Sequence, residues 1–365
     1  MAPPSWIQDE PAFRIQTEPG SEPVISVDGA FDAPGLNLSH WPGHRTPPEL
    51  RRDLSTEVAL DFVALAPERQ AELAGGCTAV VNNHYDTDGV CSAFALLQPE
   101  IALAHRDALL AAAAAGDLFR VPTEDAFCLD VVVGAFADPE RSPIAPELAQ
   151  LGRSQRYERA SLALFERLPA LLDGGGLAPY EGLWAEPLAR LRSDQERLSS
   201  AAFDELVHLD AGVYLAPTSN EIGPFDPGRH ALFGASELDR LLVLGQDTEG
   251  CAARLIFNTT SWFDLTSRRP QARPDLAELA AELNALEGCA KDADERWRAQ
   301  PADSPAPELW FGREIAGLYL EHGAPHQGTS KLGPLVIKAR VLDALRNCWT
   351  FSDDEDEEEG DWRIV

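Results

Sequence analysis

A short apolar segment, followed by an acidic turn and a helix, constrains the fold of this chain more than any other feature. Residues 78–81 are apolar and β-branched, which is typical of a buried strand. Helices are expected over 90–97 and 100–115, with Gly116 as a left-handed cap of the second. Another strand is expected over 127–136. This alternation of strands and helices predicts an α/β layer domain with a parallel sheet.

The 365 residues fit one large domain or two medium ones. The predicted organisation is an N-terminal wrapping segment (1–56), an α/β metal-site region (57–140), a helical connection (141–203), a C-terminal α+β part (204–351) and an acidic disordered tail (352–365). Two short extended pieces, Val24–Val27 and Leu36–Ser39, fall inside the wrapping segment. In the C-terminal part, strands are expected over 206–215, 241–244 and 253–258, and a helix over 275–286.

The chain is strongly acidic, which limits its partners. Sixty acidic residues against 30 lysines and arginines give a net charge of −30. Such a surface repels phosphate backbones and anionic lipid, so a small molecule or short nucleotide is expected rather than long nucleic acid or a membrane. The first residues have neither a basic start nor an apolar run, and no transmembrane stretch is found, which predicts a cytoplasmic protein. Three lysines against 27 arginines indicate a bacterial genome rich in GC.

The acidic turn itself, His84-Tyr85-Asp86-Thr87-Asp88-Gly89, carries the residues that indicate chemistry. Alternate side chains of an extended segment share a face, so His84, Asp86 and Asp88 converge just beyond the predicted strand. Ligands of parallel α/β sheets bind at such strand ends. Two close carboxylates repel unless a cation lies between them, and the mixed donors suit Mn²⁺, Fe²⁺ or Zn²⁺ better than Ca²⁺. A simple turn with Asx hydrogen bonds is the alternative.

Residues 83–93, Asn-His-Tyr-Asp-Thr-Asp-Gly-Val-Cys-Ser-Ala, resemble the first motif of the DHH phosphoesterase superfamily, which includes RecJ-type nucleases, oligoribonucleases and inorganic pyrophosphatases. In that superfamily, a strand ends in a His/Asp-x-Asp-x-Asp-Gly loop and a helix follows. The resemblance implies a DHH-like parallel-sheet domain in which His84 and Asp86 ligate metal and Asp88 is a ligand or supports one. It also implies Mn²⁺ or Mg²⁺, often as a pair, acting on a phosphoester.

No two histidines are adjacent, so the Asp-His-His triplet of the superfamily has no counterpart, and other residues are expected to complete the site. Asp117, after the second predicted helix, and His105, on that helix, are the first candidates. Asp130, His208 and Asp210 are weaker candidates. Each of these also has an ordinary structural explanation, as a cap, a surface residue or a buried histidine. The six cysteines contain no Cys-x-x-Cys pair, so buried thiols are expected rather than a zinc–thiolate site.

Four residues outside the turn are candidates for binding substrate: Arg254, His322, His326 and Lys331. Arginine binds phosphate or carboxylate readily, and Lys331 is one of three lysines. Surface ion pairs and solvated loops explain these residues equally well. A turn over residues 38–45 holds two histidines and a tryptophan; it could line a pocket, but is interpreted as an anchor of the wrapping segment.

The leading hypothesis is a metal-dependent hydrolase in which metal-activated water attacks a phosphoester of a small molecule or short nucleotide. Asp86 and Asp88 are the candidate catalytic residues, and Asp88 orients the water. Mn²⁺ is the first choice of cofactor, before Mg²⁺, Fe²⁺ or Zn²⁺. Two alternatives remain: a non-heme iron or zinc enzyme that performs non-phosphoester chemistry, and a catalytically inactive DHH-like binding module.

Overall fold

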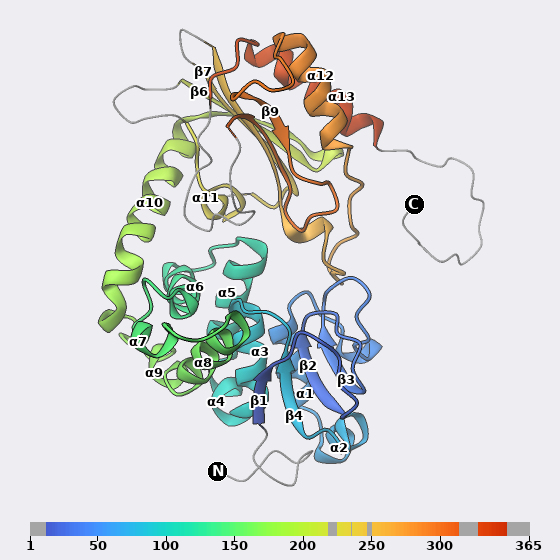
Figure 1. Ribbon diagram of the computed structural model, residues 1–365, viewed down its shortest axis with the longest axis vertical. Coiled ribbons are helices and arrows are strands. Elements are labelled where there is room, and N and C mark those ends of the chain that lie inside the picture. The colour runs from blue at the N-terminus through green and yellow to red at the C-terminus, as the bar shows by residue number, and fades with distance from the viewer. Residues whose placement is uncertain (1–11, 218–224, 235, 247–249, 314–327, 349–365) are drawn as a thin grey trace, which may run out of the picture.

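The computed structural model of the chain describes residues 12–217, 225–234, 236–246, 250–313 and 328–348. Two sheets, each with its own helices, form an N-terminal part (residues 12–200) and a C-terminal part (residues 202–348) (Figure 1). The long helix α10 (Glu181–Ser200) runs along one side of the molecule toward the second sheet. The predicted fold class, a parallel-sheet α/β part followed by an α+β part, is confirmed.

The first sheet is parallel and has the strand order β1-β4-β2-β3. Its strands are β1 (Ala12–Ile15), β2 (Val24–Asp28), β3 (Gly35–Ser39) and β4 (Ala79–Asn82). Residues 12–39, expected to wrap the surface, thus provide three of the four strands. The physical reason is burial: all five residues of β2 are buried beside β4, as expected of a strand inside a parallel sheet.

Helices surround this sheet and shape its polar edge. They are α1 (Ser55–Val63), α2 (Pro67–Ala74), α3 (Thr87–Leu97), α4 (Pro99–Ala104), α5 (Arg106–Leu118), α6 (Glu124–Ala137), α7 (Ala145–Leu148), α8 (Arg153–Phe165) and α9 (Leu168–Leu171), with short 3-10 turns at Pro48–Leu50 and Ala178–Tyr180. The core joins strand residues such as Ile25 and Val80 to Phe62 of α1 and Phe94 of α3. The acidic turn therefore lies between a rigid strand and a well-packed helix.

The strand expected over residues 127–136 is wrong, because these residues lie within the helix α6. The segment is apolar on nearly every side and is buried under neighbouring helices, so it shows no amphipathic pattern. A run of valines at 131–133 then favours a strand on propensity alone. The start of the helix is marked, however, by the side chain of Thr123, which accepts a hydrogen bond from Ala126 N at 3.1 Å.

The helix expected over 100–115 is divided into α4 and α5 at His105, and it does not end at Gly116. Gly116 lies inside α5, where a Cβ would be 3.0 Å from Asp130 Oδ1 and 3.0 Å from Thr87 Cβ. It is there for close packing against α3 and α6. The left-handed cap is Phe119, with φ +54°.

The second sheet is mixed and has the strand order β5-β6-β7-β8-β10-β9. Its elements are β5 (Ala202–Leu206), β6 (Ala211–Pro217), α11 (Arg229–Gly234), β7 (Arg240–Gln246), β8 (Cys251–Phe257), η4 (Thr259–Ser261), α12 (Leu276–Glu287), β9 (Arg296–Ala299), β10 (Glu308–Gly312) and α13 (Pro334–Asn347), with a 3-10 turn at Val207–Leu209. Helices α12 and α13 pack on one face, and the other face packs against α6 and α10. None of the helices in the described part of the chain combines the length and hydropathy needed to cross a bilayer.

Candidate metal centre

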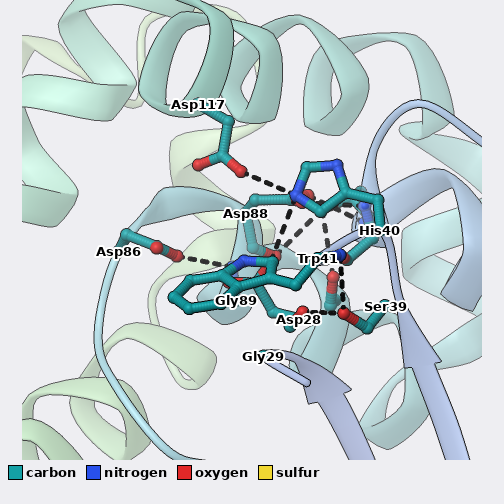
Figure 2. Close-up of polar contacts among 12 residues, drawn as sticks. Asp28, Gly29, Ser39, His40, Trp41, Asp86, Asp88, Gly89 and Asp117 are labelled. Carbon is teal, nitrogen blue, oxygen red and sulfur yellow. Dashed lines mark hydrogen bonds and ion pairs between the residues drawn. The ribbon is translucent and has the colours of Figure 1, made fainter. Parts of the chain in front are cut away.

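Two histidines and four aspartates meet at the carboxyl edge of the first sheet. Figure 2 shows five of them, His40 and the four aspartates. Asp28 ends β2, His40 follows β3, and His84 and Asp86 follow β4. Asp88 lies in the first turn of α3 and Asp117 in the last turn of α5. Since β4, β2 and β3 are neighbours, their ends deliver these side chains to one place, as expected for a parallel sheet.

Four of these residues, Asp28, His40, Asp88 and Asp117, form a buried group whose potential ligand atoms lie within 4.8 Å of one another. His40 Nε2 lies 3.7 Å from Asp28 Oδ1, 3.7 Å from Asp88 Oδ2 and 3.1 Å from Asp117 Oδ2. The other ring nitrogen, Nδ1, lies 2.5 Å from the carbonyl oxygen of Asp53, to which it must donate a proton. The lone pair of a neutral His40 is therefore directed at three carboxylates, the arrangement found in metal sites.

A second, half-exposed group consists of Asp28, His84 and Asp86. His84 Nε2 lies 2.9 Å from Asp28 Oδ2 and 2.7 Å from Asp86 Oδ2, and its Nδ1 lies 2.6 Å from Asn83 Oδ1. The side chains of His84 and Asp86 are 24% and 33% exposed, whereas those of Asp28 and His40 are fully buried. Asp28 belongs to both groups, one carboxylate oxygen facing each.

Polar atoms at the centre of this cluster face only one another. Within the described part of the chain, the oxygens of Asp28 and Asp117 Oδ2 are approached by the ring nitrogens of His40 and His84, at 2.9–3.7 Å, and form no hydrogen bond with any backbone group or other side chain. The ion pairs described for the four aspartates are all with His40 or His84. Buried acceptors that face one another repel, so this geometry requires a cation or protons between them.

The pKa values of the cluster are shifted by burial and by the charges of neighbouring side chains. Burial, reinforced by the charge of Asp86, raises the pKa of Asp28 well above its usual value. Burial and the charges of Asp86 and Asp88 do the same to the pKa of Asp117. Burial opposes the charged form of His84, but Asp86 and Asp28 outweigh it and raise its pKa. Burial also opposes ionisation of Asp86, yet the charge of His84 lowers its pKa to about 2. These shifts are those expected of carboxylates and imidazoles that are packed together without a cation between them.

Local backbone features hold the aspartates in place. Asp86 is the N-cap of α3, and its Oδ1 accepts a hydrogen bond from Gly89 N at 2.8 Å. Asp28 has φ +64°, a left-handed conformation that is rare outside glycine and that clusters at functional sites. The N-cap position of Asp86 and the left-handed backbone of Asp28 orient their carboxylates toward the cluster.

Asp88 serves the fold as well as the centre. Its two carboxylate oxygens accept hydrogen bonds from the backbone N–H groups of Ser55, at 2.7 Å, and Thr56, at 2.8 Å. These are the first residues of α1, so Asp88 caps that helix from a distance and meets the positive end of its dipole. The buried group is thereby joined to the N-terminus of a second helix.

Gly89→Ala is expected to lower the free energy of unfolding by about 1–3 kcal/mol, since overpacking in a tight site costs that much. An alanine Cβ would lie 2.1 Å from Asn82 Nδ2 and 3.0 Å from Asp28 Oδ2. Denaturant unfolding in the presence of chelator measures the change. The matched control is Gly182→Ala, because Gly182 lies in α10 with nothing within 4 Å of its added Cβ. Equal stability of the two variants would contradict this packing argument.

The structure brings together four of the five residues predicted to ligate metal: His84, Asp86, Asp88 and Asp117. His105 is not in either group. It precedes α5, twelve residues before Asp117, a separation of about 18 Å along a helix. Its Nε2 instead lies 3.8 Å from Asp173 Oδ1.

The weaker candidates have other neighbours. Asp130 accepts a hydrogen bond from Thr87 Oγ1 at 2.5 Å, so it supports the turn without joining either group. Asp210 accepts hydrogen bonds from Asp239 N and from the side chain of Arg268. His208 is exposed in the C-terminal part.

The residues predicted to bind substrate lie in the C-terminal part or outside the described residues. Arg254 is buried in β8 and binds two carboxylates, with Nη1 2.6 Å from Asp226 Oδ1 and Nε 2.8 Å from Glu308 Oε2. Lys331 is exposed. His322 and His326 fall outside the described residues. The role of these four residues in binding stays a prediction.

Sequence reasoning missed Asp28 and His40 as site residues. Each follows one of the two extended pieces noted in the first forty residues, and His40 belongs to the turn interpreted as an anchor. Placing those pieces in the same parallel sheet as β4 would have identified both, because the carboxyl ends of neighbouring parallel strands share an edge.

Comparisons with known proteins give a family and little else. No curated protein matches the chain. An exopolyphosphatase-related protein from Bacteroides fragilis aligns over 91% of this chain and 92% of its own length, with 11% identity and a TM-score of 0.24, a similarity too low to support an argument. The model of one sequence family matches residues 11–356. The chain therefore belongs to DUF6687, a family of unknown function.

Proposed function

We propose that the protein is a metal-dependent hydrolase that acts on a phosphoester of a small molecule or short nucleotide, using two divalent cations that share Asp28. The observation that carries this proposal is the orientation of Asp28, whose buried carboxylate faces both groups and, among the described residues, is approached only by the ring nitrogens of His40 and His84. The DHH-like motif at residues 83–93 supports the same chemistry.

The two groups differ in a way that suits hydrolysis. The buried group offers one histidine nitrogen and three carboxylates and is closed to solvent, as expected of a site that holds its cation firmly. The half-exposed group offers three ligands beside solvent, which leaves positions for water and substrate, as in catalytic metal sites. When bound, such a pair of cations activates water and neutralises charge on the reacting phosphoester.

Residues of the cluster have different roles in this proposal. Asp86 and His84, which are partly exposed, can orient water and accept its proton. Asp88 was predicted to orient water, but it is fully buried and bonded to α1, so we assign it to the buried group. The indole of Trp41 packs beside the half-exposed group, with its ring centroid 4.8 Å from that of His84, where it can contact substrate (Figure 2).

The donor set favours Mn²⁺ or Mg²⁺. Each group has one histidine and at least two carboxylates, a combination rich in oxygen. A two-histidine, one-carboxylate iron site is less well supported, because His40 and His84 face different groups. The third possibility, a binding module without metal, requires protons instead of cations between the facing carboxylates of the cluster.

Metal analysis by plasma mass spectrometry, on protein purified without a chelating tag, together with assays of phosphate release from aryl phosphates and short nucleotides, tests the proposal. Two equivalents of Mn²⁺ or Mg²⁺ with metal-dependent hydrolysis are expected. Iron with oxygen-dependent turnover would favour the second possibility. Protein that neither contains metal nor binds added Mn²⁺ would contradict the proposal and favour the binding module.

Asp86→Asn is expected to remove one cation of the two and to reduce hydrolysis by at least about 100-fold. Asparagine is an equally good N-cap, so α3 should begin normally and the buried group should remain loaded. Metal content, hydrolysis rate and thermal stability measure the three effects. Asp173→Asn, at an exposed residue beside His105 that is in neither group, is the control and should keep both cations. An Asp86→Asn protein with two cations and full activity would exclude Asp86 from the centre.

A further inference from the structure

Residues 258–267 of the C-terminal part, which we name the docking segment, lie against two elements that carry ligands of the buried group. Thr259 Oγ1 donates a hydrogen bond to the carbonyl oxygen of Asp117 at 2.5 Å. Asp264 N donates to the carbonyl oxygen of His40 at 2.8 Å. The ring of Phe263 stacks on the imidazole of His40, with centroids 3.9 Å apart and planes 23° apart. The docking segment therefore touches His40 on its backbone and its ring face.

Asp53 connects the same segment to His40 by a second route. Its carbonyl oxygen accepts the proton of His40 Nδ1 at 2.5 Å, which fixes the tautomer and the direction of Nε2. Its carboxylate accepts hydrogen bonds from Thr266 N at 2.8 Å, Thr266 Oγ1 at 2.8 Å, Ser267 N at 2.9 Å and Ser267 Oγ. The side chain of Asp53 is thus bound by the C-terminal part, and its backbone carbonyl is bound to His40, a proposed metal ligand.

We infer that the docking segment positions His40 and Asp117, so that cation binding in the buried group and docking of the C-terminal part are one coupled equilibrium, with Asp53 as the positioning residue. This inference rests on the proposed metal centre but not on the reaction it performs. Coupling of this kind is reciprocal: a displaced segment weakens the metal site, and a bound cation strengthens docking by the same factor.

The coupling follows from the chemistry of the contacts. Hydrogen bonds to the outer nitrogen of a histidine ligand set its orientation and basicity, and their loss typically costs 10- to 100-fold in metal affinity. Four donors on one carboxylate form a strong charge-assisted contact, so the position of Asp53 depends on Thr266 and Ser267. The stacked ring of Phe263 limits tilting of the imidazole.

Asp53→Ala tests the inference through two measurements that do not involve activity. Mn²⁺ affinity, measured on metal-free full-length protein by competition with a chelating indicator, is expected to fall about 10- to 100-fold at the tighter site. Backbone hydrogen exchange in residues 258–267 is expected to slow when Mn²⁺ is added to the wild type and to change little in the variant. Asp53→Asn, which keeps one acceptor oxygen, should restore part of the affinity.

The matched control is Glu237→Gln. Glu237 pairs with Arg120 at 2.8 Å across the same boundary between the two parts, and among the described residues neither side chain has a hydrogen bond or ion pair with a ligand of the centre. The Mn²⁺ affinity of the Glu237→Gln variant should equal that of the wild type. If Asp53→Ala does not fold, Ser267→Ala removes one donor from an exposed residue and should shift affinity in the same direction by a smaller factor.

Several outcomes would overturn the inference. Wild-type Mn²⁺ affinity in folded Asp53→Ala or Ser267→Ala would show that the docking segment does not position His40. An equal loss in Glu237→Gln would show general loosening of the boundary instead. If the wild type binds no Mn²⁺, the proposed centre fails together with this inference, whereas the other two outcomes leave the centre intact.

Discussion

Asp28→Asn is expected to remove both cations and, at the same time, to make the metal-free protein more stable. The carboxylate of Asp28 serves both groups, so its loss weakens each of them. Without a cation, burial and the neighbouring carboxylates oppose ionisation of Asp28 and raise its pKa, since like charges at about 4 Å repel by about 4 kcal/mol at an effective dielectric constant of 20. Asparagine removes this charge and tolerates the left-handed backbone at position 28.

Metal analysis and thermal unfolding in chelator measure the two effects. We expect fewer than one equivalent of Mn²⁺, hydrolysis reduced at least about 1,000-fold, comparable with the loss of a major transition-state contact, and a rise of a few degrees in the metal-free Tm. The control is Asp32→Asn, four residues further on, where the side chain is 95% exposed. A variant that retains two cations, or whose metal-free Tm falls, would contradict the shared role of Asp28.

Saturating Mn²⁺ is expected to raise the Tm of the wild type by about 10 °C over its value in chelator. A ligand at 1,000 times its Kd stabilises the folded state by about 4 kcal/mol. For a chain of 365 residues, each kcal/mol moves the Tm by about 1.3 °C, so two such sites together account for about 10 °C. The gain comes from neutralising buried carboxylates that face one another in the metal-free protein. Thermal unfolding with added Mn²⁺, Mg²⁺, Ca²⁺ or chelator measures it.

Two controls separate this effect from general salt stabilisation. Ca²⁺, which prefers six to eight oxygen ligands, should stabilise less than Mn²⁺ at the same concentration. The Asp28→Asn variant should respond weakly to either cation. An unchanged Tm in the presence of every cation would mean that protons alone balance the buried carboxylates, and the cluster would then be a structural feature.

Local patterns in the sequence predicted the part of the centre that lies in one turn. His84, Asp86 and Asp88 were found from their spacing after a strand, because that geometry depends on a few consecutive residues. Asp117 was found from its position at the end of a helix. These residues need no knowledge of strand pairing, which is why reasoning from a single sequence reached them.

The rest of the centre depends on contacts between residues far apart in the chain. Asp28 and His40 become site residues because β2 and β3 pair beside β4, a register that no local pattern encodes. The mistaken strand at 127–136 has a related cause. Its β-branched residues match strand propensity, and the decision for a helix comes from burial against other elements, so tertiary packing overrides local preference.

The two aspartates at positions 28 and 88 differ in what the fold would lose without them, and this has an evolutionary consequence. Asp88 caps α1, so natural selection for a folded chain keeps it even where no cation is needed. The carboxylate of Asp28 has ion pairs only with His40 and His84 among the described residues, both of them members of the centre, and it is expected to weaken the metal-free fold. A lineage of this family that abandons its metal should therefore replace Asp28 early and retain Asp88, so a sequence alignment can distinguish descendants that still bind metal from those that have ceased to.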